Sequence, residues 1–101
     1  MQIHVIDKQK LITREDNMTQ DWVSGYWGVT KDIAEKLVGG ELFLHMAKDK
    51  PSYFGGDITG FSIQEDGEYA GKVLFEFTAS MDHKGVRTPR PGWGMDKKII
   101  E

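Results

Sequence analysis

Three clusters in which aromatic residues stand beside glycine are the features of this chain most suited to binding a flat ligand. They are Tyr26-Trp27-Gly28, Tyr53-Phe54-Gly55-Gly56 and Gly92-Trp93-Gly94. Glycine has no Cβ, so a heterocycle can approach the backbone beside it and stack on the neighbouring ring. The alternative is that the glycines form turns and the rings fill the ends of a small β fold. Because the combination recurs, we expect a binding surface with stacking rings.

The segment from Tyr53 to Gly56 is the best candidate for a pocket wall. Tyr53 and Phe54 are adjacent rings followed by two glycines, and stacking of a base on such a ring contributes about 1–3 kcal/mol. The glycine amides are then available to a base edge or a phosphate. The alternative is a β-bulge or wide turn that Phe54 anchors in the core.

A basic stretch near the end of the sequence is the candidate phosphate contact. Between residues 84 and 98, five basic residues accompany a single acidic one, Asp96. The basic residues are Lys84, Arg87, Arg90, Lys97 and Lys98. Such a stretch binds phosphate with salt-sensitive affinity, or it is simply a solvated loop. The net charge of −3 argues against strong nucleic-acid binding through overall charge.

Motifs for catalysis and for metal binding are not recognisable. The three histidines, His4, His45 and His83, are far apart and lack metal-ligand spacing, so we expect no metal site and no cofactor. Gly-x-Ser-x-Gly, phosphate-loop and dinucleotide fingerprints do not occur. A non-catalytic role is therefore favoured, although the sequence does not decide whether the protein is an enzyme. His45 either lines a pocket, where it would donate and accept hydrogen bonds, or faces solvent.

Length and composition indicate an ordinary globular protein. The 101 residues fit a single domain spanning residues 1–101, with 39% hydrophobic and 29% charged residues. No apolar run approaches the roughly 20 residues needed to span a bilayer, and the first residues lack a signal-peptide pattern. There are no cysteines. We expect a cytoplasmic protein that does not enter a membrane; its oligomeric state is left open.

Hydrophobic periodicity predicts five short strands and one main helix. Strands are expected at residues 2–6, 41–46, 57–64, 72–78 and 95–100, the last closing the sheet, with a long loop over residues 7–24. Thr30 is the expected helix N-cap, and Gly39 and Gly40 are expected to end that helix. Asp66 and Gly67 indicate a hairpin turn. The predicted class is α+β, with a small curved mixed β-sheet or β-barrel of about five strands.

The order of these elements carries a family resemblance. Trp27-Gly28-Val29, the helix, the strand at 41–46, the run Phe54-Gly55-Gly56-Asp57-Ile58-Thr59-Gly60 and the strand at 72–78 resemble the PUA-like superfamily, and within it the EVE-type domains. The resemblance covers about residues 26–78. It implies a compact β-barrel with a flanking helix, and a pocket that receives a base, often a modified one, within RNA or DNA. The pocket residues that it implies are Trp27, Ser52, Tyr53 and Phe54, with Trp93 contributed by the C-terminal segment.

Two functions follow as hypotheses. The first is a non-catalytic PUA-like module that recognises a nucleobase-containing ligand by aromatic stacking, with Lys84, Arg87 and Arg90 meeting phosphate. The second is a small protein-interaction or accessory factor, of a phage type, that uses exposed Trp93 and Tyr26 as interface anchors. A nucleic acid, a nucleotide or a protein is accordingly the expected partner.

Overall fold

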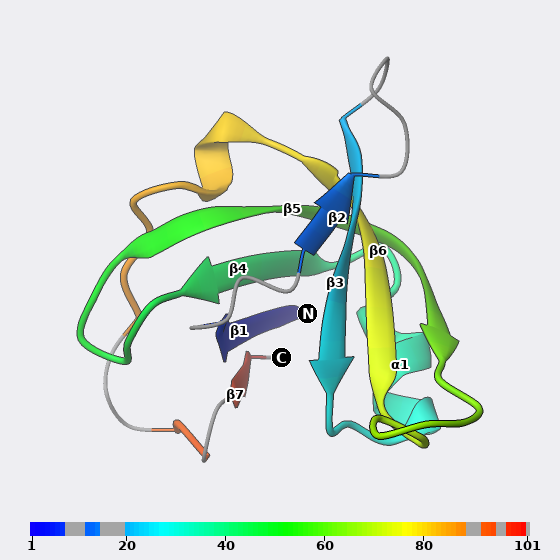
Figure 1. Ribbon diagram of the computed structural model, residues 1–101. Coiled ribbons are helices and arrows are strands. Elements are labelled where there is room, and N and C mark those ends of the chain that lie inside the picture. The colour runs from blue at the N-terminus through cyan, green and yellow to red at the C-terminus, as the bar shows by residue number, and fades with distance from the viewer. Residues whose placement is uncertain (8–11, 15–19, 89–91, 95–96, 101) are drawn as a thin grey trace.

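One mixed sheet of seven strands dominates the computed structural model across the residues that it describes, which are 1–7, 12–14, 20–88, 92–94 and 97–100. The strands are β1 (Gln2–Ile6), β2 (Ile12–Arg14), β3 (Asp21–Trp27), β4 (Glu41–His45), β5 (Ser52–Ile63), β6 (Val73–Ala79) and β7 (Lys97–Ile100). A helix, α1 (Lys31–Leu37), and a short 3₁₀ helix, η1 (Met81–His83), complete the described elements (Figure 1). The α+β class with one main helix is therefore confirmed, whereas five strands is too few.

The two additional strands come from the segment expected to be a loop. β3 pairs antiparallel with β6, and β2 pairs antiparallel with β3. Ser24 and Gly25 interrupt the apolar pattern in the middle of β3, and glycine is depleted in strands. Pairing with β6, which contains Val73, Phe75 and Phe77, overrides that weak local preference.

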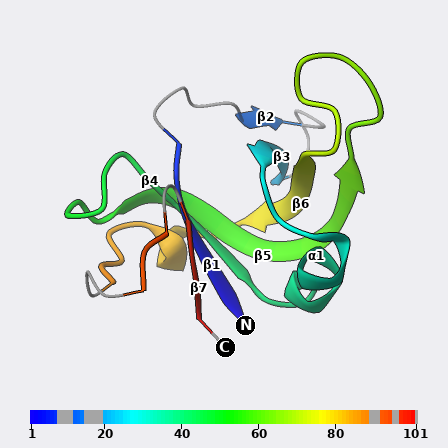
Figure 2. The same cartoon turned by 90° about the horizontal axis from the view of Figure 1, so that it is seen from below.

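β5 holds the sheet together because it pairs with a different neighbour along each half. Its first half pairs with β4, and from Gly56 onward it pairs with β6. Figures 1 and 2 show it as one continuous arc across the sheet. Phe54, Gly55 and Gly56 thus pair with β4 in a strand rather than forming an open loop, and Tyr53 lies at a β-bulge or irregularity between the Phe54 and Ser52 pairs.

The described strands form an open sheet in the order β2-β3-β6-β5-β4-β1-β7. β1 is parallel to β4, and every other pair is antiparallel. β7 does not close the sheet as expected. It lies against β1 at one edge, with Gln2 opposite Ile100, so these two strands run side by side in both views.

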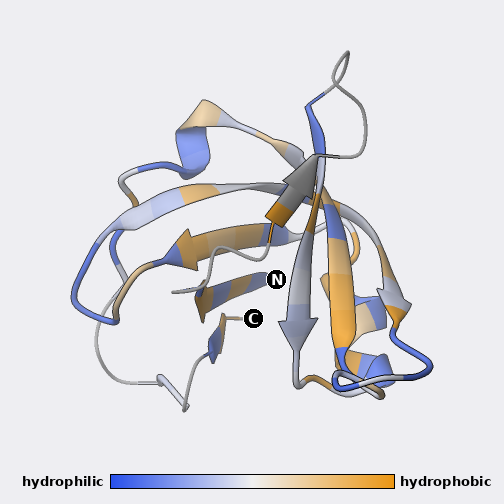
Figure 3. Cartoon of the chain, viewed as in Figure 1, coloured by the Kyte–Doolittle hydropathy of each residue, from blue (hydrophilic) through white to orange (hydrophobic). Residues whose placement is uncertain are grey.

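One face of the sheet and one side of α1 enclose the hydrophobic core. Figure 3 shows the most hydrophobic stretches on β4 and β6. The buried core residues are Ile3, Val5, Trp27, Ala34, Leu37, Leu42, Leu44, Ile58, Val73, Phe75 and Phe77. Their alternation along β1, β4 and β6 leaves the intervening side chains on the opposite face, which we call the outer face.

Helix α1 begins and ends where the sequence predicts. The Thr30 hydroxyl accepts a hydrogen bond from the Ile33 amide at 3.3 Å, as an N-cap should. Gly39 follows the helix with a φ of 88°, a conformation that favours glycine. Its amide donates to the Ile58 carbonyl at 2.9 Å, which fixes the end of the helix on β5. Among the described helices, none has the length and apolar character needed to cross a membrane.

Candidate functional site

The three histidines of the chain meet on the outer face. They belong to a row of rings, here called the ring row, made of His45, His4, Phe43 and His83. Successive ring centroids along it are 5.1, 4.5 and 4.8 Å apart, and Trp93 lies edge-on to His45 at 5.6 Å. Strand pairing brings His4 of β1 opposite Phe43 of β4. Sequence spacing could not reveal this grouping, because it depends on parallel pairing of distant strands and on the return of η1.

His4 and His45 form a buried hydrogen-bonded pair. Their relative exposures are 2% and 0%. His45 Nδ1 lies 2.9 Å from the Lys50 carbonyl oxygen and must donate to it, so His45 Nε2 accepts from His4 Nδ1 at 2.8 Å. Burial first, and then the charges of His45 and Lys98, lower the pKa of His4 to about 4. His45 therefore neither faces solvent nor offers free ring nitrogens to a ligand.

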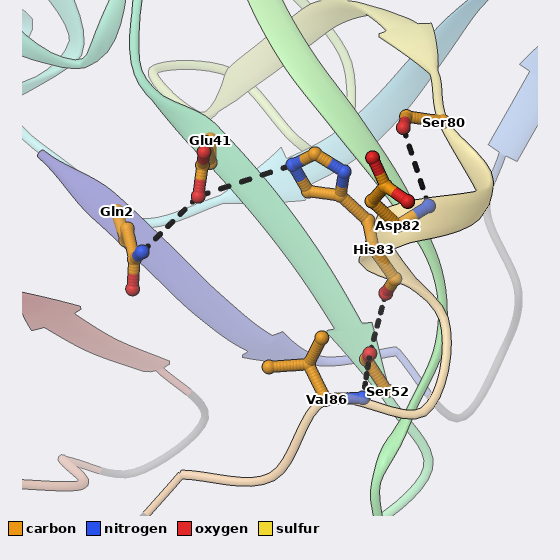
Figure 4. A network of polar contacts seen from close by, with 7 residues as sticks. All are labelled: Gln2, Glu41, Ser52, Ser80, Asp82, His83 and Val86. Atoms are coloured by element: carbon orange, nitrogen blue, oxygen red, sulfur yellow. Dashed lines mark hydrogen bonds and ion pairs between the residues drawn. The ribbon is translucent and has the colours of Figure 1, made fainter.

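A second polar group lies at the other end of the ring row. His83 is 6% exposed, and its Nε2 atom is 4.0 Å from Glu41 Oε2 (Figure 4). The Gln2 amide donates to that same oxygen at 3.1 Å. Asp57 completes the group, because one potential ligand atom from each of Glu41, Asp57 and His83 lies within 4.8 Å of the others.

A surface pocket of about 300 Å³ lies beside η1. Its lining residues are Gln20, Phe54, Ala79, Ser80, Met81 and Lys84. The Lys84 ammonium is 5.6 Å from the centroid of the Phe54 ring, and Trp22 packs edge-to-face on that ring at 5.1 Å. The pocket therefore combines an aromatic surface, a cation, a hydroxyl and an amide. It also brings together two of the residues predicted from the sequence, Phe54 and Lys84.

The other predicted pocket residues lie elsewhere. Trp27 is a core residue, 8% exposed, and its indole N–H donates to the Ser24 hydroxyl at 3.1 Å. The Ser52 hydroxyl is fully used, because it donates to the His83 carbonyl and accepts from the Val86 amide (Figure 4). Neither residue therefore presents a free group to a ligand.

Tyr53 and Trp93 are half-buried and do not share a pocket. The Tyr53 phenol donates to the Asp7 carboxylate at 3.1 Å, and burial followed by that carboxylate raises its pKa. Trp93 packs against the rings of His4 and His45. Trp27, Tyr53 and Trp93 thus contact three different parts of the molecule and do not form the single stacking surface that was expected. Of the predicted aromatic residues, Phe54 is the one that lines the pocket.

The predicted phosphate contacts are only partly brought together. Lys84 lines the pocket, whereas the exposed Arg87 guanidinium donates to the Asp49 carbonyl at 3.2 Å. Arg90 lies outside the described residues.

The glycines that follow Phe54 were expected to offer their amides to a ligand, but the structure gives one of them another role. A Cβ on Gly56 would lie 1.9 Å from the Thr78 carbonyl oxygen, so this glycine makes room for β6 rather than for a ligand.

Comparison of the chain with protein-family models, with curated proteins and with solved structures gives no match.

Proposed function

We propose that this protein is a non-catalytic binding module that takes a nucleobase-containing ligand, one nucleotide in size, in the pocket beside η1. The observation that carries the proposal is the position of the Lys84 ammonium beside the Phe54 ring in a pocket of about 300 Å³. That volume is at the lower end of the range for small-molecule sites. An aromatic ring next to a cation matches the two parts of a nucleotide, its base and its phosphate.

The pocket supplies a partner for each part of such a ligand. The base would stack on Phe54, against which Trp22 and Phe77 pack edge-to-face with ring centroids 5.1 and 5.7 Å away. Gln20 is exposed, and its carboxamide can both donate to and accept from a base edge. The resemblance to the PUA-like superfamily favours the same ligand class.

Lys84 must leave the ring face when a base stacks there. An exposed cation–π contact contributes about 0.5–1 kcal/mol, whereas base stacking on an aromatic side chain contributes about 1–3 kcal/mol. Lys84 is exposed, so its flexible side chain can move toward the phosphate. Replacing the Lys84–Phe54 contact by base stacking on Phe54 is therefore favourable, and Lys84 then contacts the phosphate of the ligand.

The negative net charge suits a short ligand better than a long polyanion. A chain of net charge −3 repels an extended nucleic acid, while one lysine is enough to meet one phosphate. The protein-interaction hypothesis is less favoured, because its two anchors are engaged within the molecule. Tyr26 stacks on Tyr69 at 4.3 Å, and Trp93 packs on the histidine pair.

The test is titration of the full chain with nucleoside 5′-monophosphates and with the matching nucleosides, followed by calorimetry and by backbone amide NMR shifts. Phe54→Leu should weaken both ligand types by about fivefold to 100-fold. Lys84→Gln should weaken only the monophosphates. Lys48→Gln, an exposed lysine that does not line the pocket, is the control and should leave both affinities unchanged. No binding at millimolar nucleotide, or binding that neither pocket variant alters, would contradict the proposal.

A further inference from the structure

We propose that Glu41, Asp57 and His83 form a binding site for a divalent transition-metal ion on the outer face of the sheet. The three side chains come from β4, β5 and η1, and one ligand atom from each lies within 4.8 Å of the others. The proposal does not depend on nucleotide binding, because none of the three residues lines the pocket.

Strand pairing forces the two carboxylates together. Glu41 of β4 is directly opposite Asp57 of β5 in an antiparallel ladder, and both side chains lie on the same face. Like charges at directly opposite positions destabilise a sheet unless something neutralises them. Within the described residues, the contact of this pair with a basic side chain is the one between Glu41 Oε2 and His83 Nε2, which is ionic only if the imidazole is protonated. A bound cation would compensate both carboxylates at once.

His83 provides the observation that points to a metal rather than to two repelling acids. Its side chain is buried, yet among the described residues neither Nδ1 nor Nε2 has a hydrogen-bond partner. Buried imidazoles normally satisfy at least one nitrogen. Figure 4 shows the ring directed at Glu41, with Nε2 4.0 Å from the carboxylate oxygen. That separation is too long for a hydrogen bond and leaves the lone pair of a neutral ring available.

The fold holds His83 in this orientation. Its ring stacks on Phe43 at a centroid distance of 4.8 Å. Its Cβ lies close over Gly55, since a Cβ added to that glycine would be only 3.1 Å away. Its amide donates to the Ser80 carbonyl, and its carbonyl accepts from the Ser52 hydroxyl. A ligand fixed by packing and by backbone hydrogen bonds is what a preorganised metal site requires.

One imidazole nitrogen with two carboxylate oxygens favours a first-row transition ion such as Zn²⁺. Calcium and magnesium prefer all-oxygen ligand sets, whereas zinc accepts both donor types. Zinc bonds of about 2.0–2.2 Å place tetrahedral ligands roughly 3.4 Å apart, so the three atoms must approach one another. Asp57 is exposed and Glu41 half-exposed, so these side chains can move while His83 stays in place. The Gln2 amide would then orient the Glu41 carboxylate from outside the ligand set.

The experiment is calorimetric titration of the chelator-treated full chain with ZnCl₂ in the absence of nucleotide, together with long-range ¹H–¹⁵N spectra of the imidazoles. We expect one ion per chain and a change in the Nε2 resonance of His83, with the His4 and His45 resonances unchanged. Asp57→Asn should weaken zinc binding at least tenfold, while Asp66→Asn, which removes an exposed turn carboxylate, should not. Circular dichroism would establish that both variants are folded.

Three results would overturn the metal site. They are the absence of binding at millimolar zinc, equal affinities of the two carboxylate variants, and zinc-induced shifts at His4 or His45 in place of His83. Nucleotide titration in the presence of the chelator tests the pocket by itself. Failure of one proposal is therefore distinguishable from failure of the other.

Discussion

The Nδ1 atom of His4 lies 2.8 Å from the Nε2 atom of His45, and both rings are buried. With the Lys50 carbonyl accepting from the far nitrogen of His45, this contact requires His45 to be neutral and His4 to donate from Nδ1. Protonation of either ring would place a charge in a buried site that also faces Lys98. Burial therefore favours the neutral form of both rings.

Stability should consequently fall as the pH drops from 6.5 toward 4. The pKa of His4 is 6.5 when unfolded and about 4 when folded, so the unfolded chain binds more protons in this interval. The full contribution is present above pH 6.5, and up to about 3 kcal/mol is lost by pH 4. Burial also lowers the pKa of His45, which acts in the same direction. Denaturant unfolding at a series of pH values measures the effect.

The control for this prediction is His4→Asn, whose amide can still donate to His45 but does not titrate. Its unfolding free energy should change less between pH 6.5 and pH 4 than that of the parent chain, because carboxylate contributions are common to both. Equal pH slopes, or a His4 resonance that titrates near 6.5, would contradict the assignment.

Trp27→Phe should reduce stability without affecting ligand binding. The substitution removes the indole N–H that donates to Ser24, whose hydroxyl is fully buried. A buried polar group left without its partner costs about 1–3 kcal/mol. Adding Ser24→Ala should recover part of that loss, since neither partner then remains. Urea unfolding of the two single variants and the double variant measures the coupling; strict additivity would show that the bond contributes nothing.

Ser52→Ala should loosen the segment that carries His83. Ser52 is buried and bridges the His83 carbonyl and the Val86 amide. Its loss leaves both groups unpaired, at a cost of about 1–3 kcal/mol, and the Val86 amide should exchange faster with solvent. Ser62→Ala, on an exposed position of β5, should change stability by less than about 0.5 kcal/mol. Equal protection of Val86 in the parent chain and in Ser52→Ala would contradict this role.

Gly56→Ala should be among the most damaging single substitutions in the chain. The new methyl group would lie 1.9 Å from the Thr78 carbonyl oxygen, where β6 backbone cannot yield without breaking the ladder. We expect a loss at or above the upper end of the 1–3 kcal/mol that overpacking usually costs. Gly28→Ala meets only the end of the Lys72 side chain at 3.1 Å and should be tolerated. Comparable melting temperatures for the two variants would contradict the distinction.

Local sequence signals predicted those elements whose own residues determine them. The alternation in β1 and β6 and the cap at Thr30 are strong local signals, and each of these elements forms where it was expected. β3 was missed because Ser24 and Gly25 weaken its pattern, and only pairing with β6 makes it a strand. The pocket wall predicted at Tyr53 to Gly56 lies in the first half of β5. Two adjacent glycines favour a loop locally, but here they allow the neighbouring strands to approach closely.

The candidate sites depend on long-range placement, which residue spacing does not encode. Phe54 and Lys84 were both predicted to contact a ligand, and the structure places them in one pocket. Their proximity to Gln20 and Met81 could not be anticipated, because it arises where the entry to β3 meets η1. Because the histidines lack metal-ligand spacing in the sequence, His83 was not expected to belong to a metal site. Only the packing of η1 over Gly55 brings it to Glu41.

The pairing of β1 with β7 has a consequence for the order in which the molecule folds. Gln2 and Ile100 are partners although almost the whole sequence separates them, whereas β5 and β6 are separated in sequence only by residues 64–72. Closing a long loop costs more entropy and takes more time than closing a short one. The β5–β6 hairpin is therefore expected to form early and the β1–β7 edge late. Because His4 lies on β1 and Lys98 on β7, the neutral histidine pair acquires its final surroundings only in the last stage of folding.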